Sequence, residues 1–278
     1  MPRNQAVQSV EEEPRLRISY SQMFTYLGCS LKYRFQYVER FPYERKSMSL
    51  FFGSCLHSAI ERFYNTYKKK GEYEPLNVLQ QLFEHLLTLE LEQVDVPIIY
   101  KKEAPDTASA IELGKSLIKT FHENVDLEGY EVIDAELPLK AKLYSEEGID
   151  TGFELYGILD LLLRDTNGQY LVVDNKTAAK PKSMKDVDND LQLTAYSYLL
   201  AAHRFVKPTD KVQCRMDVLR KLKTPKLSYY CTERSARDRK RFAKLAGAVL
   251  SGIDNQVFMP NQSWLCADCP YTKACQAW

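Results

Sequence analysis

The chain has 278 residues, of which 45% are hydrophobic and 27% charged, with seven cysteines and a formal net charge of +1. This composition is ordinary for a soluble globular protein. No stretch approaches the roughly 20 apolar residues of a membrane span, and the first residues lack the apolar core of a signal peptide. We therefore expect a cytoplasmic protein with no membrane partner, whose cysteines stay reduced unless they bind metal or do redox chemistry.

The small net charge hides an asymmetry along the chain. Residues 176–278 carry 19 Lys and Arg against 9 Asp and Glu, whereas residues 1–175 carry 19 against 28. A basic segment suits a polyanionic partner, because contacts with phosphates release counterions and so favour binding. Charge alone does not distinguish this interpretation from a solvated basic surface.

The first half of the chain is predicted to be helical after a flexible tail at residues 1–14. Ser19 to Gln22 match a capping box that opens a helix, and Gly28 is a suitable stop for it. A second helix is expected to run through Tyr33 and Tyr37. The apolar spacing then predicts three longer helices, at 53–70, 76–94 and 107–127.

The hydrophobic period changes after residue 130. Apolar residues alternate from Ile133 to Leu143, which predicts a strand. Further strands are expected at 153–164, 170–177, 212–220 and 227–232, with helices at 187–203 and 234–251. We therefore predict one α/β domain over residues 15–278, made of a helical insertion at about 53–127, a core at 130–254 and an irregular, cysteine-rich tail at 255–278.

The turn between the second and third strands fixes a register. Facing residues of an antiparallel pair have a constant index sum, so placing Asp160 opposite Asp174 also pairs Asp165 with Gln169. That leaves a three-residue loop, for which a type I turn with Gly168 in the left-handed region and a bulge is the expected form.

Two acids and a lysine stand in otherwise apolar strands: Asp160, Asp174 and Lys176. A lone carboxylate in such a strand is costly unless a cation or hydrogen bonds compensate. Asp174 and Lys176 project from the same strand face. Two carboxylates on adjacent strands would form a hard-oxygen site for Mg²⁺ or Mn²⁺, and the lysine could orient the attacking water. The alternative is that these are strand-end residues that reach solvent.

Two further candidates are weak when each is taken alone. His57 lies on the amphipathic helix that we expect from Gly53, where a histidine is more often a core or surface residue than a metal ligand. Gln192 and Tyr196 form an i, i+4 pair on the helix after the Asp-x-Lys strand, which is usually amphipathic patterning.

The cysteines form a C-x2-C-x5-C motif in the tail. Three cysteines so close in a cytoplasmic protein indicate metal ligands rather than disulfides. Zinc and an iron–sulfur cluster both accept four thiolates, so the ligand type leaves the choice open. Three of the four remaining cysteines lie in regular elements and are expected to be buried structural thiols, so we favour Cys29 as the fourth ligand. The tail motif comprises Cys266, Cys269 and Cys275, and the three expected structural thiols are Cys55, Cys214 and Cys231.

Taken in order, these motifs resemble a known family. His57, then Gly157-x-x-Asp160, Asp174-x-Lys176 and Gln192-x-x-x-Tyr196 resemble the RecB-like branch of the PD-(D/E)XK nucleases. With Cys29-x-x-x-Tyr33-x-x-x-Tyr37 and the tail cysteines, the match is to the group with a four-cysteine iron–sulfur cluster. That group includes the CRISPR-adaptation nucleases and the AddB-type nuclease domain, and the resemblance covers about residues 18–276.

The resemblance implies a restriction-endonuclease-like α/β core, with a central mixed sheet flanked by helices and an iron–sulfur staple. It implies roles for the motif residues as well. His57, Asp160 and Asp174 would bind the metal together with the backbone carbonyl of Asn175. Lys176 would be the catalytic lysine, and the Gln192–Tyr196 pair would line the DNA path. The [4Fe–4S] ligands would be Cys29, Cys266, Cys269 and Cys275.

Three departures from the family pattern remove no chemical group that the mechanism needs. Asp174 stands where Glu is commoner, Ser30 replaces a frequent proline, and no proline precedes Asp160. We therefore expect a metal-dependent DNA nuclease, with single-stranded DNA exonuclease activity in repair, recombination or CRISPR adaptation. Helicase or CRISPR-adaptation proteins are the expected partners. The alternatives are a DNA-binding adaptor with an inactive site and a zinc-stapled protein with no nuclease role.

Overall fold

The computed structural model describes residues 16–145 and 147–278, so the predicted tail at 1–14 lies outside the described residues. The strands are β1 (Leu16–Ser19), β2 (Lys46–Ser47), β3 (Ile98–Ile99), β4 (Tyr130–Tyr144), β5 (Asp150–Asp165), β6 (Tyr170–Ala178), β7 (Val212–Arg220) and β8 (Lys226–Arg234). The helices are α1 (Tyr20–Gly28), α2 (Ser30–Tyr33), α3 (Met48–Lys70), α4 (Leu76–Glu92), α5 (Thr107–Asn124), α6 (Met184–Asp188), α7 (Leu191–Ala202), α8 (Ala236–Asp254) and α9 (Thr272–Gln276). A π-helical turn, η1 (Arg34–Val38), and a 3₁₀ turn, η2 (Trp264–Asp268), complete the order.

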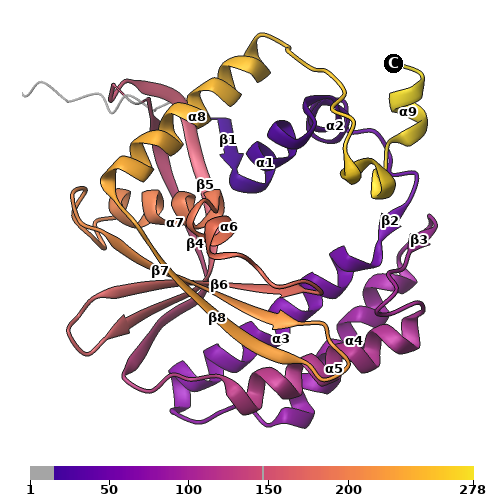
Figure 1. Ribbon diagram of the computed structural model, residues 1–278, viewed down its shortest axis with the longest axis vertical. Helices are drawn as coiled ribbons and strands as arrows, with labels where there is room; N and C mark the ends of the chain where they lie inside the picture. The colour runs from indigo at the N-terminus through magenta and orange to yellow at the C-terminus, as the bar shows by residue number, and fades with distance from the viewer. Residues whose placement is uncertain (1–15, 146) are drawn as a thin grey trace, which may run out of the picture.

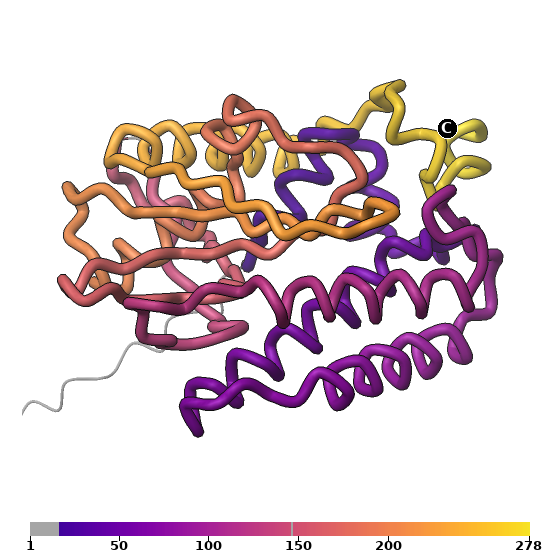
Figure 2. Tube along the Cα trace, turned by 60° about the horizontal axis from the view of Figure 1, so that its bottom comes forward, coloured from indigo at the N-terminus to yellow at the C-terminus, as the bar shows by residue number. Residues whose placement is uncertain are grey.

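A six-stranded mixed sheet forms the centre of the molecule, as the α/β prediction requires. Its order is β1-β5-β6-β7-β8, and β4 pairs with β5. Figures 1 and 2 show α3, α4 and α5 as a layer on one side of the sheet, with α1, α7 and α8 on the other side. Each layer buries its own hydrophobic cluster against the sheet. We refer to them as the α3-side core and the α7-side core.

Several predicted helix ends are confirmed by the hydrogen bonds. Ser19 and Gln22 form the capping box that opens α1, and α1 ends at Gly28. The helix expected from Gly53 begins earlier, at Met48, because the Ser47 hydroxyl accepts the N–H of Ser49 and caps it there. Gly53 is therefore an interior residue of α3.

The helix predicted at 187–203 is wrong in one respect, because the chain breaks into α6 and α7. Asp190 caps α7 by accepting the N–H of Leu193. The buried guanidinium of Arg234, on β8, donates to the carbonyl oxygens of Val187 and Asp190 and so stabilises the break between α6 and α7. Prediction also missed β1, which has only four residues, and the short helical turns of the tail.

The predicted turn after β5 is confirmed. The Asp165 N–H donates to the Gln169 carbonyl at 2.9 Å, and the Gly168 N–H donates to the Asp165 carbonyl at 3.0 Å. Gly168 has φ 80°, in the left-handed region that a glycine adopts without steric cost. The ladder runs from Arg164↔Tyr170 to Leu161↔Val173, which puts Asp160 and Asp174 at the next step.

Strand β5 uses its two edges differently. One edge pairs with β4 over almost its whole length. The other edge pairs with β1 at residues 153–156 and with β6 at residues 161–164. The intervening residues, 157–160, carry the Gly157-x-x-Asp160 motif, so the motif lies where β1 and β6 part.

In β4, the residue opposite Asp160 is Glu136, which has φ 51°. The alternation of side chains between the two faces of the sheet reverses at this point. Ala135 and Leu161 belong to the α3-side core, whereas Leu137 and Leu159, each two residues away along its strand, contact the α7-side core. The reversal places Glu136 and Asp160 between the two layers.

In the described part of the chain, no helix is long and apolar enough to cross a membrane.

Candidate metal and catalytic site

One histidine and two carboxylates converge at the gap between β1 and β6. Nδ1 of His57, on α3, lies 3.5 Å from Oδ2 of Asp160 and 3.6 Å from Oε1 of Glu136. Ligand atoms of these three residues all lie within 4.8 Å of one another. His57 and Asp160 were predicted as candidate ligands from the sequence, whereas Glu136 was not, because regular alternation assigns Glu136 to the solvent face.

Asp160 is 7% exposed and is fixed by its neighbours. Its Oδ2 accepts the N–H of Asn175 at 2.7 Å, so the backbone beside Asp174 is held against it. Burial raises the pKa of Asp160, although the nearby His57 and Lys176 oppose that shift. For His57, burial lowers the pKa, but the hydrogen bond to Glu136 and the charge of Asp160 outweigh it, so the pKa is raised.

A chain of side chains leads from Asp174 to α7. The Lys176 ammonium donates to Asp174 Oδ1 at 2.8 Å and to the Gln192 amide oxygen at 3.0 Å. The Gln192 amide nitrogen then donates to the Tyr196 hydroxyl at 2.6 Å. One hydrogen-bonded chain therefore links four of the predicted motif residues, Asp174, Lys176, Gln192 and Tyr196.

Asp174 carries the strongest indication that a cation binds in this region. It is fully buried, and among the described residues its Oδ2 has no hydrogen-bond partner. Burial raises its pKa to about 7, although Lys176 opposes the shift. A buried carboxylate oxygen without a partner is costly unless a cation binds it. The nitrogen and oxygen atoms of His57, Glu136 and Asp160 form a donor set suited to Mg²⁺ or Mn²⁺. Asp174 lies outside this set, at the next step of the ladder from Leu161↔Val173.

Gly157 allows β5 and α7 to approach closely. A Cβ atom at this position would lie 2.9 Å from Cδ1 of Leu199 and 3.6 Å from Cε1 of Tyr196. Any larger residue would therefore push on the helix that carries Gln192 and Tyr196. The glycine of the Gly157-x-x-Asp160 motif thus sets the distance between the acid on β5 and the amide–phenol pair on α7.

The predicted cluster ligands lie in one neighbourhood at the junction of the two chain ends. Cys29, Cys269 and Cys275 pack against a small core of Leu31, Phe35 and Tyr271. Burial raises the pKa of the Cys269 thiol, and the neighbouring Cys29 and Cys266 raise it further. The same causes, with burial again the largest, raise the pKa of the Cys275 thiol.

Backbone amides also point at two of these sulfur atoms. The N–H of Lys32 donates to Cys29 Sγ, and the N–H of Ser263 donates to Cys266 Sγ, each at 3.5 Å. Such donors suit thiolates that carry negative charge. Within residues 16–145 and 147–278, no three cysteine sulfur atoms lie within 4.8 Å of one another.

The other three cysteines were predicted to be buried structural thiols. Cys55 and Cys214 are buried, as expected. Cys231 is exposed, so that prediction is wrong. It lies on β8, the edge strand of the sheet formed by the described residues, where Tyr229, Cys231 and Glu233 are exposed on one face. A strand position alone does not reveal which face a side chain takes.

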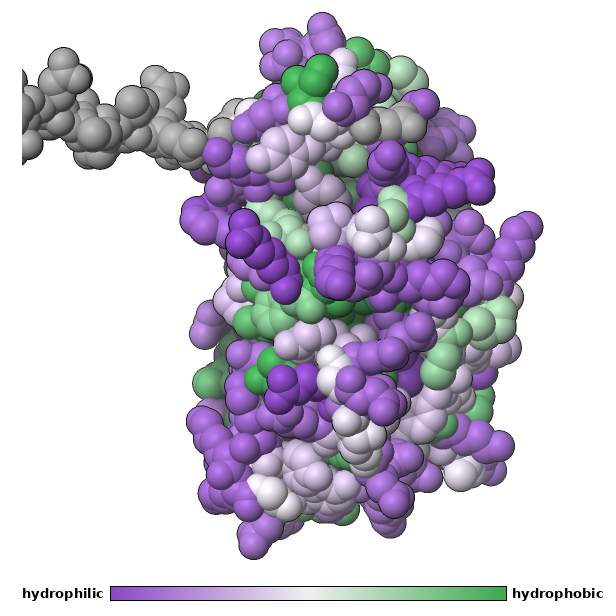
Figure 3. Space-filling view, turned by 90° about the vertical axis from the view of Figure 1, so that its left-hand side faces the viewer, coloured by the Kyte–Doolittle hydropathy of each residue, from purple (hydrophilic) through white to green (hydrophobic). Residues whose placement is uncertain are grey.

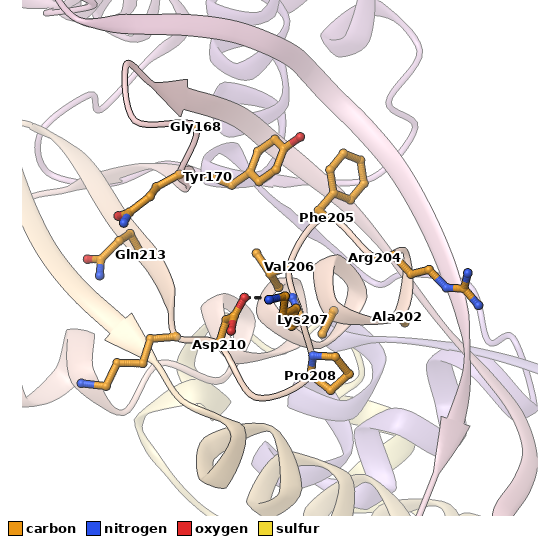
Figure 4. A pocket seen from close by; sticks show the side chains of 13 residues that line it. Gly168, Tyr170, Ala202, Arg204, Phe205, Val206, Lys207, Pro208, Asp210 and Gln213 are labelled. Carbon is orange, nitrogen blue, oxygen red and sulfur yellow. Dashed lines mark hydrogen bonds between the residues drawn. The ribbon is translucent and has the colours of Figure 1, made fainter.

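A cavity of about 1080 Å³ lies at the other end of the sheet, between the β5–β6 turn and the loop after α7. Figure 4 shows the rings of Tyr170 and Phe205 together on one side of it, and their centroids are 5.3 Å apart. This cavity contains none of the motif residues, so we do not assign the catalytic chemistry to it.

The side of the molecule drawn in Figure 3 is mainly hydrophilic, with hydrophobic side chains in small patches.

A family model and two solved structures match this chain. The model of the PD-(D/E)XK nuclease superfamily matches residues 17–276. Among solved structures, the chain is similar to a candidate exonuclease from Eubacterium rectale, with a TM-score of 0.57, 11% identity, and coverage of 94% of this chain and 87% of the other. The protein SSO0001 gives a TM-score of 0.38 at 15% identity, covering 92% and 93% of the two chains. No curated protein matches significantly.

Proposed function

Because this chain belongs to the PD-(D/E)XK nuclease superfamily, we propose that it is a Mg²⁺- or Mn²⁺-dependent deoxyribonuclease that hydrolyses phosphodiester bonds. The observation that carries the proposal is the arrangement of Asp160, Asp174 and Lys176, with one buried Asp174 oxygen lacking a partner in the described chain. A site that had lost its chemistry would have no reason to keep these charges in apolar strands.

The position of each residue determines its proposed role. His57, Glu136, Asp160 and Asp174, with the carbonyl of Asn175, would hold the divalent cation. When bound, the cation neutralises charge on the scissile phosphate and makes the attacking water more acidic. The Lys176 ammonium, held between Asp174 and Gln192, orients that water. Gln192 and Tyr196 line the path of the strand.

The proposed substrate is single-stranded DNA degraded from an end, in DNA repair, recombination or CRISPR adaptation, inside the cytoplasm. The basic C-terminal third supports a nucleic-acid partner. A helicase or CRISPR-adaptation protein would deliver such ends. A circular single strand, which has no ends, distinguishes exonuclease from endonuclease activity, since only an endonuclease cleaves it.

Lys176→Ala tests the assigned site. We expect it to lose cleavage of end-labelled DNA while retaining DNA binding, because most phosphate contacts would come from elsewhere. Residues that act as one unit lose activity non-additively, so Asp160→Ala, Asp174→Ala and the triple variant should each be about as inactive. Lys182→Ala, an exposed lysine outside the site, is the matched control. Cleavage by Lys176→Ala at the wild-type rate would show that the site is assigned wrongly.

We propose an iron–sulfur cluster as a second part of this function. Cys29, Cys266, Cys269 and Cys275 would hold a [4Fe–4S] centre as thiolates. The packing of Cys29, Cys269 and Cys275 around one small core supports this proposal, as do the backbone N–H groups that donate to Cys29 Sγ and Cys266 Sγ. The cluster would tie α1 and α2 to the tail and need not transfer electrons.

Metal analysis of anaerobically purified protein tests the cluster. We expect a brown preparation that contains iron and acid-labile sulfide. A colourless preparation with stoichiometric zinc would establish the zinc staple instead.

A DNA-binding adaptor is the second candidate function, and the basic C-terminal third is compatible with it. Wild-type protein with its metals supplied would then bind DNA and never cut it, whereas the nuclease proposal requires cleavage that Mg²⁺ supports and EDTA abolishes.

A further inference from the structure

A second, smaller cavity begins where the catalytic strand ends. It has a volume of about 230 Å³ and is lined by Met48 and Phe52 of α3, Glu103, Thr177 of β6, and Lys221. Thr177 directly follows Lys176 in β6, so its side chain faces α3, whereas that of Lys176 faces α7. On α3, the lining residue Phe52 precedes His57 by five residues, about 7.5 Å along the helix axis at roughly 1.5 Å per residue. The cavity therefore lies on the α3 side of the sheet, near enough to His57 for a neighbouring phosphate of a strand bound at the proposed site.

Lys221 gives this cavity its chemical character. Its ammonium nitrogen lies 4.3 Å from the centroid of the Phe52 ring, a cation–π contact. The Lys221 N–H donates to the Ala178 carbonyl at 2.9 Å, which fixes the residue to the end of β6. Within the described chain, no carboxylate lies within 4 Å of the ammonium group, although Glu103 is near enough to act on it electrostatically.

The other lysine of the lining differs in this respect. Lys101 forms an ion pair with Asp268 in the tail, so its charge is already compensated. Lys221 is half-buried, and burial lowers its pKa while Glu103 opposes the shift. A half-buried cation that rests on a ring, with no carboxylate in contact, favours the binding of an anion at that position.

The size of the cavity limits the ligand. Drug-sized ligands occupy pockets of about 300–1,000 Å³, and this cavity is smaller. A phosphate group fits it, whereas a whole nucleotide does not. Its position at the end of β6 makes a backbone phosphate of the bound strand the nearest source of such an anion.

We propose that Lys221 is a phosphate-binding residue, which holds a backbone phosphate of the nucleic-acid strand one or two linkages from the scissile one. The inference rests on the proposed nuclease function. Lys221 thereby sets which linkage reaches Asp160, Asp174 and Lys176, and it acts by positioning the strand rather than by taking part in the reaction.

Binding experiments with neutral linkages test the proposal. Short single-stranded DNA oligonucleotides carry one methylphosphonate at successive positions, and their affinities are measured by fluorescence anisotropy in Ca²⁺. The protein carries Lys176→Ala, so that binding is measured without cleavage. We expect one neutral linkage to weaken binding about tenfold to this protein but to change nothing once Lys221→Gln is added. The salt dependence of binding should also fall by about 0.7 in slope with Lys221→Gln, the value for one phosphate contact on a single strand.

Controls separate the site from general charge and from folding. Lys221→Arg keeps the charge and should retain the sensitivity to the neutral linkage. Lys207→Gln removes an exposed lysine beside the distant cavity and should leave that sensitivity unchanged. Thermal unfolding shows whether Lys221→Gln is folded. If that variant is unstable, Lys221→Met, which keeps the apolar stem over Phe52, is used in its place.

The outcomes distinguish this inference from the proposed function. If Lys221→Gln and every neutral linkage have additive effects, Lys221 binds no phosphate and the inference is wrong, whether or not the wild type cuts DNA. If coupling is present but the wild type never cuts DNA, the phosphate site stands and the nuclease proposal fails.

Discussion

At the scale of single residues, the position of Glu136 depends on one backbone angle. Its φ of 51° lies in the left-handed region, which a residue other than glycine adopts at a cost of order 1–3 kcal/mol. Regular alternation from Ile133 to Leu143 predicts that Glu136 faces solvent, and only the reversal turns it toward His57 and Asp160. No sequence signal marks such a reversal, because glutamate rarely takes this conformation.

Asp160, Asp174 and Lys176 were predictable for the opposite reason. A charged residue in an apolar strand conflicts with the hydrophobic pattern, and the sequence shows that conflict directly. Their partners were less accessible. The contact of Lys176 with Gln192 spans 16 positions and depends on how α7 packs.

Glu136→Gln should lower the pKa of His57 in the metal-free protein. The hydrogen bond and charge of Glu136 raise that pKa, whereas burial lowers it, so removing the charge leaves burial less opposed. The shift is measured by NMR titration of the imidazole protons. Glu131→Gln, whose exposed carboxylate pairs with Arg164, is the control and should leave His57 unchanged. An unchanged pKa in Glu136→Gln would contradict the assigned contact.

At the scale of elements, the strand pairings follow from local turns more readily than from long-range contacts. The β5–β6 register was predictable because a three-residue loop with Gly168 admits few geometries. The α6–α7 break was not, because Arg234 creates it from more than 40 positions away. β1 was missed because four residues carry too little of the period-two pattern, yet it occupies the edge of β5 next to the site.

Gly157→Ala should destabilise the protein by about 1–3 kcal/mol, the usual cost of overpacking. The added Cβ would meet Leu199 at 2.9 Å and press on Tyr196, so cleavage should fall as well. The measurements are thermal or urea unfolding and the cleavage rate. Gly53→Ala is the matched control: a Cβ there meets no atom within 4 Å, and alanine in a helix interior should add roughly 0.5–1 kcal/mol. Equal stabilities for both variants would refute the packing argument.

At the scale of the whole molecule, the tail contacts two segments that both lie far from it in the sequence. On one side, the Tyr26 hydroxyl donates to the Val257 carbonyl at 2.8 Å, and the Asn261 amide donates to the Gly28 carbonyl at 2.9 Å. On the other side, the Glu44 carboxylate accepts the N–H of Lys273 at 2.9 Å. Figure 1 shows the tail, drawn in yellow, beside α2. The sequence predicted a link between Cys29 and the tail cysteines through a shared metal group, which these hydrogen bonds do not test, and no pattern predicted the contact of Glu44.

Cys29→Ser should loosen the tail and lower the stability of anaerobically prepared protein. Closing the loop between Cys29 and the tail would contribute roughly 4–5 kcal/mol to the free energy of unfolding, by analogy with a disulfide and without allowance for strain. The readouts are the free energy of unfolding and limited proteolysis between α8 and α9. Cys231→Ser, which changes an exposed cysteine far from the tail in sequence, is the control. A Cys29→Ser protein as stable as the control would mean that nothing bridges Cys29 to the tail.

The reversal at Glu136 and Asp160 also limits which changes in chain length the fold tolerates. In β5, the odd-numbered Leu155 and Leu159 face the α7-side core before this point, and the odd-numbered Leu161 and Leu163 face the α3-side core after it. Deleting one residue from β5 would move a set of leucines to the opposite face of the sheet, whereas replacing the acid changes only one side chain. Descendants of this chain could therefore lose activity by substitution while keeping the fold. Inactive homologues should accordingly keep the length of β5, and their loss of activity should be visible only in the identity of the residues.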